Sequence, residues 1–128
     1  MSTTALTRET YQQTISGDGI VLVDWWASWR GPCRSFAPVV EQASQRHTDI
    51  VFAKVDTEAE QHLAYAARIS SILTLMAFRD GILVFSQPGA LPSTALEELI
   101  TAVRALDMDQ VCSKVAQRGV AKAAQAPN

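Results

Sequence analysis

Blocks of apolar residues along this chain predict short buried strands separated by helices. The nearly continuous β-branched and aromatic run from Ile20 to Trp26 is typical of a strand covered on both faces of a sheet. Ile50 to Val55 has the same character. Leu73 to Phe78 and Ile82 to Phe85 are predicted strands joined by the turn sequence Arg-Asp-Gly. Because Asp-Gly between apolar runs is a strong hairpin signal, these last two strands are predicted to be antiparallel neighbours.

Residues with helical periodicity separate the predicted strands. The predicted helices are Thr7 to Ile15, Gly31 to about Arg46, Glu58 to about Ala67, and Ser93 to about Leu106. Strands and helices therefore alternate and end in a hairpin and a helix. This order predicts an α/β fold in which a central mixed sheet carries helices on both faces.

The C-terminal segment predicts one more element. Asp107 to Gln110 resembles a capping box, and the helix that it begins should end near Gly119. Residues 121–128 are small and polar, and they are predicted to be disordered. We therefore expect one domain over residues 1–106 and an extension over residues 107–128. Cys112 falls beside apolar residues of the predicted tail helix, where packing is its expected role.

Composition and charge exclude several classes of function. The 128 residues suit a single domain, and a net charge of −2 gives no field to attract nucleic acid or an anionic membrane surface. No apolar run approaches the roughly 18 residues that a membrane-spanning helix needs. The first residues lack the basic start and apolar stretch of a secretory signal. We therefore expect a cytoplasmic protein with reduced thiols, and neither nucleic acid nor a membrane as partner.

The sequence WASWRGPCR, Trp26 to Arg34, is the motif with the clearest chemistry. Gly-Pro is followed by Cys33, but Arg30 occupies the position where a dithiol motif has its first cysteine. The cysteines also do not fit metal-ligand spacing with His47 or His62. No metal site and no cofactor are predicted.

These residues resemble the thioredoxin family. VLVDWWASW-x-GPCR, residues 21 to 34, resembles its active-site segment, and Phe52 to Asp56 is similar to its next strand. Ile69 to Phe78 is similar to the substrate loop and the strand after it, and Pro88-Gly89-Ala90 to the glycine loop. The resemblance implies a thioredoxin fold and a protein-disulfide reductase. Its partners would be protein disulfides and thioredoxin reductase.

The resemblance also implies roles for individual residues. Cys33 stands at the position of the resolving thiol, and Asp24 at that of a buried carboxylate that relays protons to it, with Lys54 as its neighbour. The implied substrate-binding residues are Trp29, Gly31, Pro32, Ser71, Ile72, Leu73 and Gly89.

Two positions depart from the family pattern, and both affect the expected chemistry. Arg30 replaces the attacking cysteine, and a guanidinium cannot attack a disulfide. Leu73 replaces the family's cis-proline. Because a cis bond before a residue other than proline costs roughly 2.5–4 kcal/mol, the Ile72–Leu73 bond is predicted to be trans and its loop to be shifted. The dithiol cycle is therefore expected to be disabled.

Two other functions stay open from the sequence. One is a peptide-binding or protein-binding module that uses the thioredoxin groove without redox chemistry. The other is a dimer that binds a metal or an iron–sulfur centre through Cys33 of each copy. The added apolar side chain of Leu73 would favour self-association, so the expected state is a monomer or a weak dimer.

Overall fold

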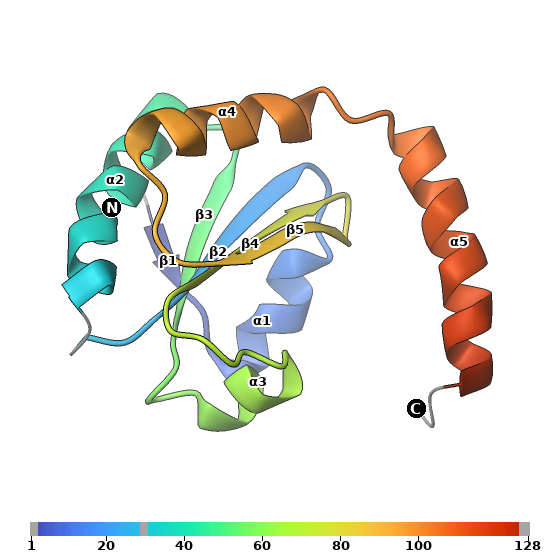
Figure 1. Ribbon diagram of the computed structural model, residues 1–128, viewed down its shortest axis with the longest axis horizontal. Coiled ribbons are helices and arrows are strands. Elements are labelled where there is room, and N and C mark those ends of the chain that lie inside the picture. The colour runs from blue at the N-terminus through green and yellow to red at the C-terminus, as the bar shows by residue number, and fades with distance from the viewer. Residues whose placement is uncertain (1–2, 29–30, 126–128) are drawn as a thin grey trace.

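One five-stranded mixed sheet forms the centre of the protein (Figure 1). The computed structural model describes residues 3–28 and 31–125, with side chains up to Ala116 in the last helix. The strand order is β1-β3-β2-β4-β5, in which β1, β3 and β2 are parallel and β4 and β5 are antiparallel to their neighbours. The strands are β1 (Thr3–Ala5), β2 (Ile20–Trp26), β3 (Val51–Asp56), β4 (Thr74–Arg79) and β5 (Ile82–Pro88). The predicted fold class is confirmed.

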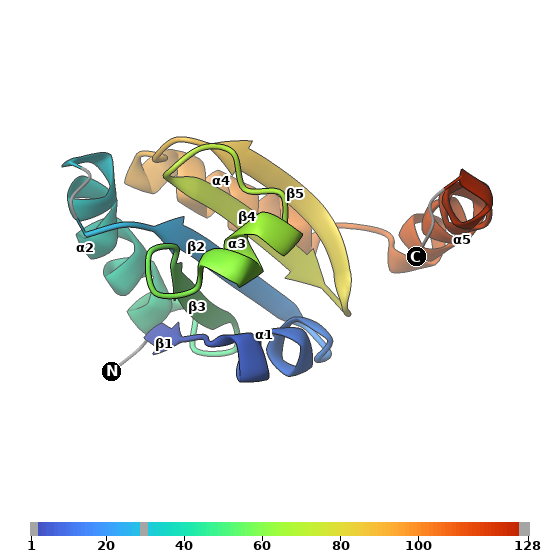
Figure 2. The ribbon, with the colours of Figure 1, turned by 90° about the horizontal axis from the view of Figure 1, so that it is seen from below.

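Helices cover both faces of this sheet and enclose two separate apolar cores. Helices α1 (Arg8–Ile15) and α3 (Gln61–Ala66) cover one face, and α2 (Gly31–Arg46) and α4 (Ser93–Arg104) cover the other (Figure 2). Strand β2 contributes to both cores because its side chains alternate. Val21, Val23 and Trp25 enter the first core, whereas Ile20 and Leu22 enter the second.

The β4–β5 hairpin forms at the predicted Asp-Gly turn. Asp80 has a φ of 53° and Gly81 a φ of 83°, the left-handed conformation that this tight turn requires. Asp80 also binds the loop before β2, since its N–H donates to the Gly19 carbonyl at 2.8 Å and its Oδ1 accepts from the Gly19 N–H at 2.8 Å. These bonds fix the hairpin against the central strand.

Strand β1 and the beginning of helix α3 differ from the sequence prediction. Strand β1 was not predicted, because three residues of Thr-Thr-Ala carry no apolar pattern and the strand exists only through its parallel pairing with β3. Helix α3 begins at Gln61 instead of Glu58. The Asp56 carboxylate accepts from the N–H groups of Glu58 and Ala59 at 2.9 and 3.2 Å, and this turn replaces the predicted first helical turn.

The C-terminal helix α5 (Met108–Gln125) projects away from the sheet in both ribbon views (Figures 1 and 2). Asp107 caps it as predicted, since its Oδ1 accepts from the N–H groups of Asp109 and Gln110 at 3.1 and 3.3 Å. The predictions of an end at Gly119 and of disorder from residue 121 were wrong as far as Gln125, and residues 126–128 lie outside the described residues. One glycine costs only about 1 kcal/mol within a helix, and the alanines that follow favour helix.

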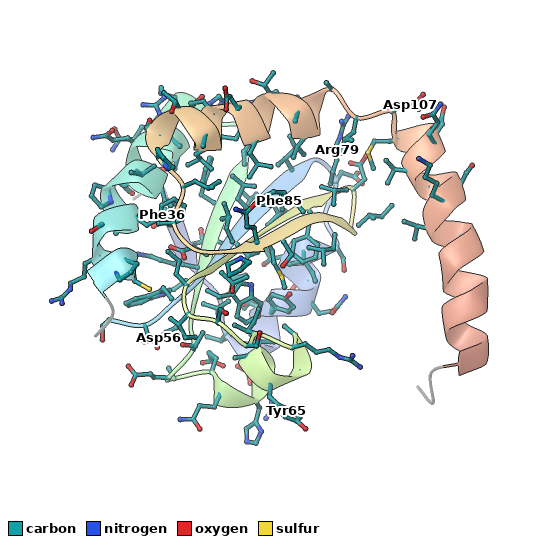
Figure 3. The ribbon with its side chains drawn as sticks, in the orientation of Figure 1. Phe36, Asp56, Tyr65, Arg79, Phe85 and Asp107 are labelled. Atoms are coloured by element: carbon teal, nitrogen blue, oxygen red, sulfur yellow. The ribbon has the colours of Figure 1, made fainter. Side chains whose placement is uncertain are left out.

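Arg79 joins the end of β4 to the end of α4. Its Nη1 donates to the carbonyl oxygens of Val103, Arg104 and Leu106 at 2.7, 3.0 and 3.1 Å. Figure 3 shows Arg79 close below the end of α4, before the chain reaches Asp107. A cation here satisfies helix carbonyls that have no partner within the helix and interacts favourably with the helix dipole.

We predict that Arg79→Met lowers the free energy of unfolding by about 1–2 kcal/mol, because half-buried carbonyl groups lose a charged donor. Urea denaturation followed by circular dichroism measures the change. Arg8→Met is the control, since the hydrogen bond of Arg8 to Glu60 comes from its backbone N–H. Equal destabilisation by the two substitutions would contradict the role given to Arg79.

Candidate active site

The thiol of Cys33 lies in the first turn of α2, directly below the chain that leaves β2. Its side chain is only 4% exposed, and the Ala27 N–H donates to Sγ at 3.4 Å. Gly31 and Pro32 are exposed at the beginning of the helix. Trp29 and Arg30, which the sequence places in the same motif, lie outside the described residues. The arrangement gives a recessed thiol rather than a surface nucleophile.

Asp24 and Lys54 are neighbours across the β2–β3 pair. The parallel register sets Asp24 opposite Lys54, on the sheet face covered by α2 and α4. Asp24 is 5% exposed, whereas Lys54 is half-buried. The Lys54 Nζ lies 5.4 Å from the ring centroid of Trp26, within the range of a cation–π contact. The predicted pairing of Asp24 with Lys54 as neighbours is confirmed, while their catalytic roles stay predictions.

A small cavity brings the carboxyl and thiol groups together. Its volume is about 90 Å³. It is lined by Asp24, Trp26, Cys33, Arg34, Ala37 and Lys54. An adjoining groove of about 320 Å³ shares Asp24, Ala37 and Lys54 with it. The Asp24 Oδ1 is buried, and it accepts no hydrogen bond from any residue that the structure describes.

Burial raises the pKa of Asp24 to about 7, and the positive charge of Lys54 opposes this rise only in part. Lys54 forms no salt bridge with Asp24 among the described ion pairs, so its effect is attraction over a longer distance. A carboxyl with this pKa exchanges its proton near neutral pH. It can therefore accept a proton from a thiol and return it.

The structure of the loop before β4 contradicts two predictions about Leu73. The Ile72–Leu73 bond is cis, so the prediction of a trans bond and a shifted loop was wrong. The Gly89 N–H donates to the Leu73 carbonyl at 2.9 Å, and the Thr74 hydroxyl donates to the Ser71 carbonyl at 2.7 Å. Leu73 is 2% exposed in the same core as Cys33, so the expected apolar surface for self-association is also absent at this residue.

The other predicted substrate-binding residues remain accessible. Ser71 and Gly89 are exposed, and Ile72 is half-buried against the core that contains Cys33 and Leu73. Gly89 has a φ of 96°, a conformation that favours glycine. The hydrogen bond from Gly89 to Leu73 thus brings residue 89 next to residues 71–73, although they are distant in sequence.

Sequence reasoning missed Ala37 as part of this site. Ala37 lies one helical turn after Cys33, so the two residues share one side of α2 and line the same cavity. The spacing was a signal that could have found Ala37. Arg34, which follows Cys33 directly in the motif, lines the cavity as well.

Comparison with known proteins identifies the family of this site. The model of the Thioredoxin family matches residues 2–102, which include every residue that lines the cavity. The chain belongs to the thioredoxin family. The resemblance found in the sequence is therefore confirmed.

Several relatives are similar over most of this thioredoxin chain. A putative thioredoxin 2 from Streptomyces coelicolor is 51% identical over 117 residues, which cover 91% of this chain and 87% of the relative. Thioredoxin 1 from Synechococcus elongatus is 45% identical, over 72% of this chain and 88% of its own. The solved structure of a Plasmodium falciparum thioredoxin matches with a TM-score of 0.71 at 32% identity, covering 77% of this chain and 97% of that one.

The second cysteine of this thioredoxin does not occupy the position expected for it. Cys112 was expected to pack on the apolar face of the tail helix, but it is exposed, because α5 projects away from the sheet. The structure contains no disulfide bond between Cys33 and Cys112.

Among the described residues, no group of three or more potential ligand side chains is placed to hold a metal ion. None of the described helices combines the length and apolar character needed to cross a membrane.

We predict that Asp24→Asn stabilises the protein at pH 8 and has little effect below pH 4. A folded-state pKa of about 7 against 3.8 corresponds to about 4 kcal/mol. This contribution is fully present below pH 3.8 and is lost as the pH rises to about 7, because burying the ionised carboxylate is unfavourable. Asparagine has nearly the same shape and stays neutral throughout.

Urea denaturation of both proteins at several pH values between 4 and 8 measures the difference. Asp18→Asn, in the exposed turn before β2, is the control for loss of an ordinary surface carboxylate. A stability difference between wild type and Asp24→Asn that is the same at all pH values would contradict the raised pKa.

Proposed function

We propose that this protein keeps the scaffold of a thioredoxin, a protein-disulfide reductase, but cannot complete the dithiol cycle. The supporting observation is the combination of a buried Cys33 with Arg30 at the position of the attacking cysteine. In the proposed organisation, residues 1–106 form the thioredoxin domain and residues 107–128 are an extension. The family match over residues 2–102 is consistent with this division.

The chemistry of disulfide exchange explains why Arg30 disables it. A thiolate near a helix N-terminus attacks the substrate disulfide, and a second thiol then displaces the reduced substrate from the mixed disulfide. Arg30 is a permanent cation that cannot perform the first step. Cys33 is 4% exposed, so it is poorly placed to reach a disulfide on a folded protein. Cys112, on the projecting helix α5, does not replace the missing partner.

The remaining groups of the site still support proton transfer in this proposal. Asp24 lines the same cavity as Cys33 and would exchange the thiol proton, with Lys54 favouring the ionised carboxylate. The substrate loop would present its backbone around Ile72. Protein disulfides and thioredoxin reductase are the proposed ancestral partners, and the cytoplasm is the proposed compartment. Cys33 then persists as a resolving thiol without an attacking thiol beside it.

Reversion of the two departures tests this proposal. We predict that the unsubstituted protein and Leu73→Pro fail to reduce insulin with NADPH and a bacterial thioredoxin reductase, whereas Arg30→Cys and the double variant turn over. The attacking thiol is the missing reactant. The proline adds less, because Leu73 already keeps the hydrogen bond from Gly89. Insulin precipitation and NADPH consumption measure both half-reactions.

Cys112→Ser in the Arg30→Cys background is the matched control, and it should retain full activity. Repeated turnover by the unsubstituted protein would refute the claim of a disabled cycle. Turnover by Leu73→Pro alone would show that Cys33 or Cys112 performs the attack.

A redox-inactive peptide-binding module is the second candidate. The observation that favours it is the anchored loop, in which exposed Ser71 and half-buried Ile72 are held by bonds independent of the thiol. Carboxymethylated insulin B chain, an extended peptide without a disulfide, is a suitable probe. We predict equal Kd values for the unsubstituted protein and Cys33→Ser in tryptophan fluorescence titrations. Loss of binding in Cys33→Ser would instead indicate capture by the thiol.

A further inference from the structure

The cavity between α2 and strands β2 and β3 has the size of a small-molecule site. Its volume of about 90 Å³ compares with the roughly 10–15 Å³ that one water molecule needs on the same measure. It therefore has room for a molecule as small as hydrogen peroxide, but not for a folded protein. The thiol of Cys33 is only 4% exposed, and it lines this cavity.

The polar groups around the cavity indicate what the small ligand must offer. The Asp24 side chain is 95% buried, and its Oδ1 accepts no hydrogen bond from the described residues. A buried carboxylate oxygen is costly without a donor, so a ligand with O–H groups would be stabilised beside it. Water meets this requirement, and so does hydrogen peroxide, which adds an O–O bond that a thiolate can cleave.

The charges around the cavity favour a reactive form of Cys33. Arg34 and Lys54 both line the cavity. Positive charges near a thiol favour its ionised form. Arg34 and Ala37 are exposed and Lys54 is half-buried, whereas Asp24 and Cys33 are buried. The cationic residues therefore stand nearer the solvent, and the thiol and carboxyl groups lie deeper.

We propose that hydrogen peroxide enters this cavity and oxidises Cys33 to a sulfenic acid, with Asp24 as the proton acceptor. The Asp24 carboxylate takes the Sγ proton, and the thiolate then attacks one peroxide oxygen. An S–O bond forms as the O–O bond breaks, and the leaving hydroxide takes the proton back from Asp24 to become water. One thiol and one peroxide thus give one sulfenic acid and one water, with sulfur oxidised and peroxide reduced.

This activity goes beyond the proposed function and does not depend on it. It uses one cysteine, no peptide groove and no thioredoxin reductase. A protein that proved active in dithiol exchange would still have this cavity. Conversely, the failure of peroxide to react at Cys33 would leave the account of the disabled dithiol cycle unchanged.

Trapping with dimedone tests the proposal on the full chain. The reduced protein is mixed with hydrogen peroxide and dimedone, and the adducts on the Cys33 and Cys112 peptides are followed by mass spectrometry. Cys112 is an internal control, because it is exposed and lies far outside the cavity, on α5. We expect Cys33 to be labelled, and the ratio of Cys33 to Cys112 labelling to fall when the bulky cumene hydroperoxide replaces hydrogen peroxide.

Two substitutions separate access from proton transfer. Ala37→Leu places a larger side chain beside the cavity on an exposed helix position, and it should reduce labelling of Cys33 but not of Cys112. Asp24→Asn removes the proton acceptor. It should lower the rate of Cys33 oxidation by about 10²-fold, the lower end of the range for general-base catalysis. Circular dichroism of each variant confirms that the fold is retained.

The pH dependence of Cys33 oxidation tests whether Asp24 acts as a base or only supports the structure. The charged or titratable groups that share the cavity and groove with Asp24 are Cys33, Arg34, Glu41 and Lys54. With Asp24 present, the rate at Cys33 should rise as the pH passes about 7, where its carboxylate forms. In Asp24→Asn that rise should move towards the ordinary thiol pKa of about 8.5.

Three results would overturn the proposal. The first is the absence of adduct on Cys33 when Cys112 is labelled. The second is a Cys33 to Cys112 ratio that does not change between the two hydroperoxides. The third is a rate and pH profile at Cys33 that Asp24→Asn leaves unaltered.

Discussion

The pairing of β2 on both of its edges is the constraint on which the rest of this structure depends. β2 is parallel to β3 and antiparallel to β4, and it is buried on both faces. Every side chain that it carries must therefore enter one of the two cores. Alternate residues direct apolar groups towards α1 and α3 or towards α2 and α4. The strand then ends at Trp26, directly before the segment that leads into the thiol helix.

Asp24 is the exception in that strand, and it accounts for the chemistry of the site. A carboxyl at a fully paired strand position has little access to water, so burial raises its pKa to about 7. Lys54 is its register neighbour, yet the amine lies against the ring of Trp26 and forms no salt bridge with Asp24 among the described ion pairs. The cavity beside Cys33 is consequently bordered by a proton acceptor whose charge is only partly compensated.

Local patterns predicted most of the fold, because most elements are determined by neighbouring residues. The apolar run of β2, the Asp-Gly turn and the cap at Asp107 are of this kind, and all three are confirmed. Strand β1 could not be predicted, since it exists only through its pairing with β3. The orientation of α5, which leaves Cys112 exposed, is likewise determined by packing and not by its own sequence.

The candidate site was likewise predicted in part, namely where its residues lie close together in the sequence. The motif placed Cys33 and Asp24 correctly near each other, because strand, turn and helix follow directly in the chain. The geometry of Leu73 was predicted incorrectly, and its hydrogen bond from Gly89, which lies in a different loop, was not predicted either. The cavity was also beyond prediction, because its volume results from the distance between α2 and β3.

Loss of the attacking thiol and retention of the site beneath it are physically compatible. Ser28 and Gly31, the described residues on either side of Arg30, are exposed, so a change at position 30 need not disturb the core. Cys33 and Leu73 instead contribute to the packing between α2, α4 and the sheet, where any change of volume has a cost. Packing therefore maintains Cys33 whether or not a dithiol cycle uses it. A thiol maintained in this way, next to a carboxyl that titrates near neutral pH, remains available for chemistry with ligands small enough to reach it.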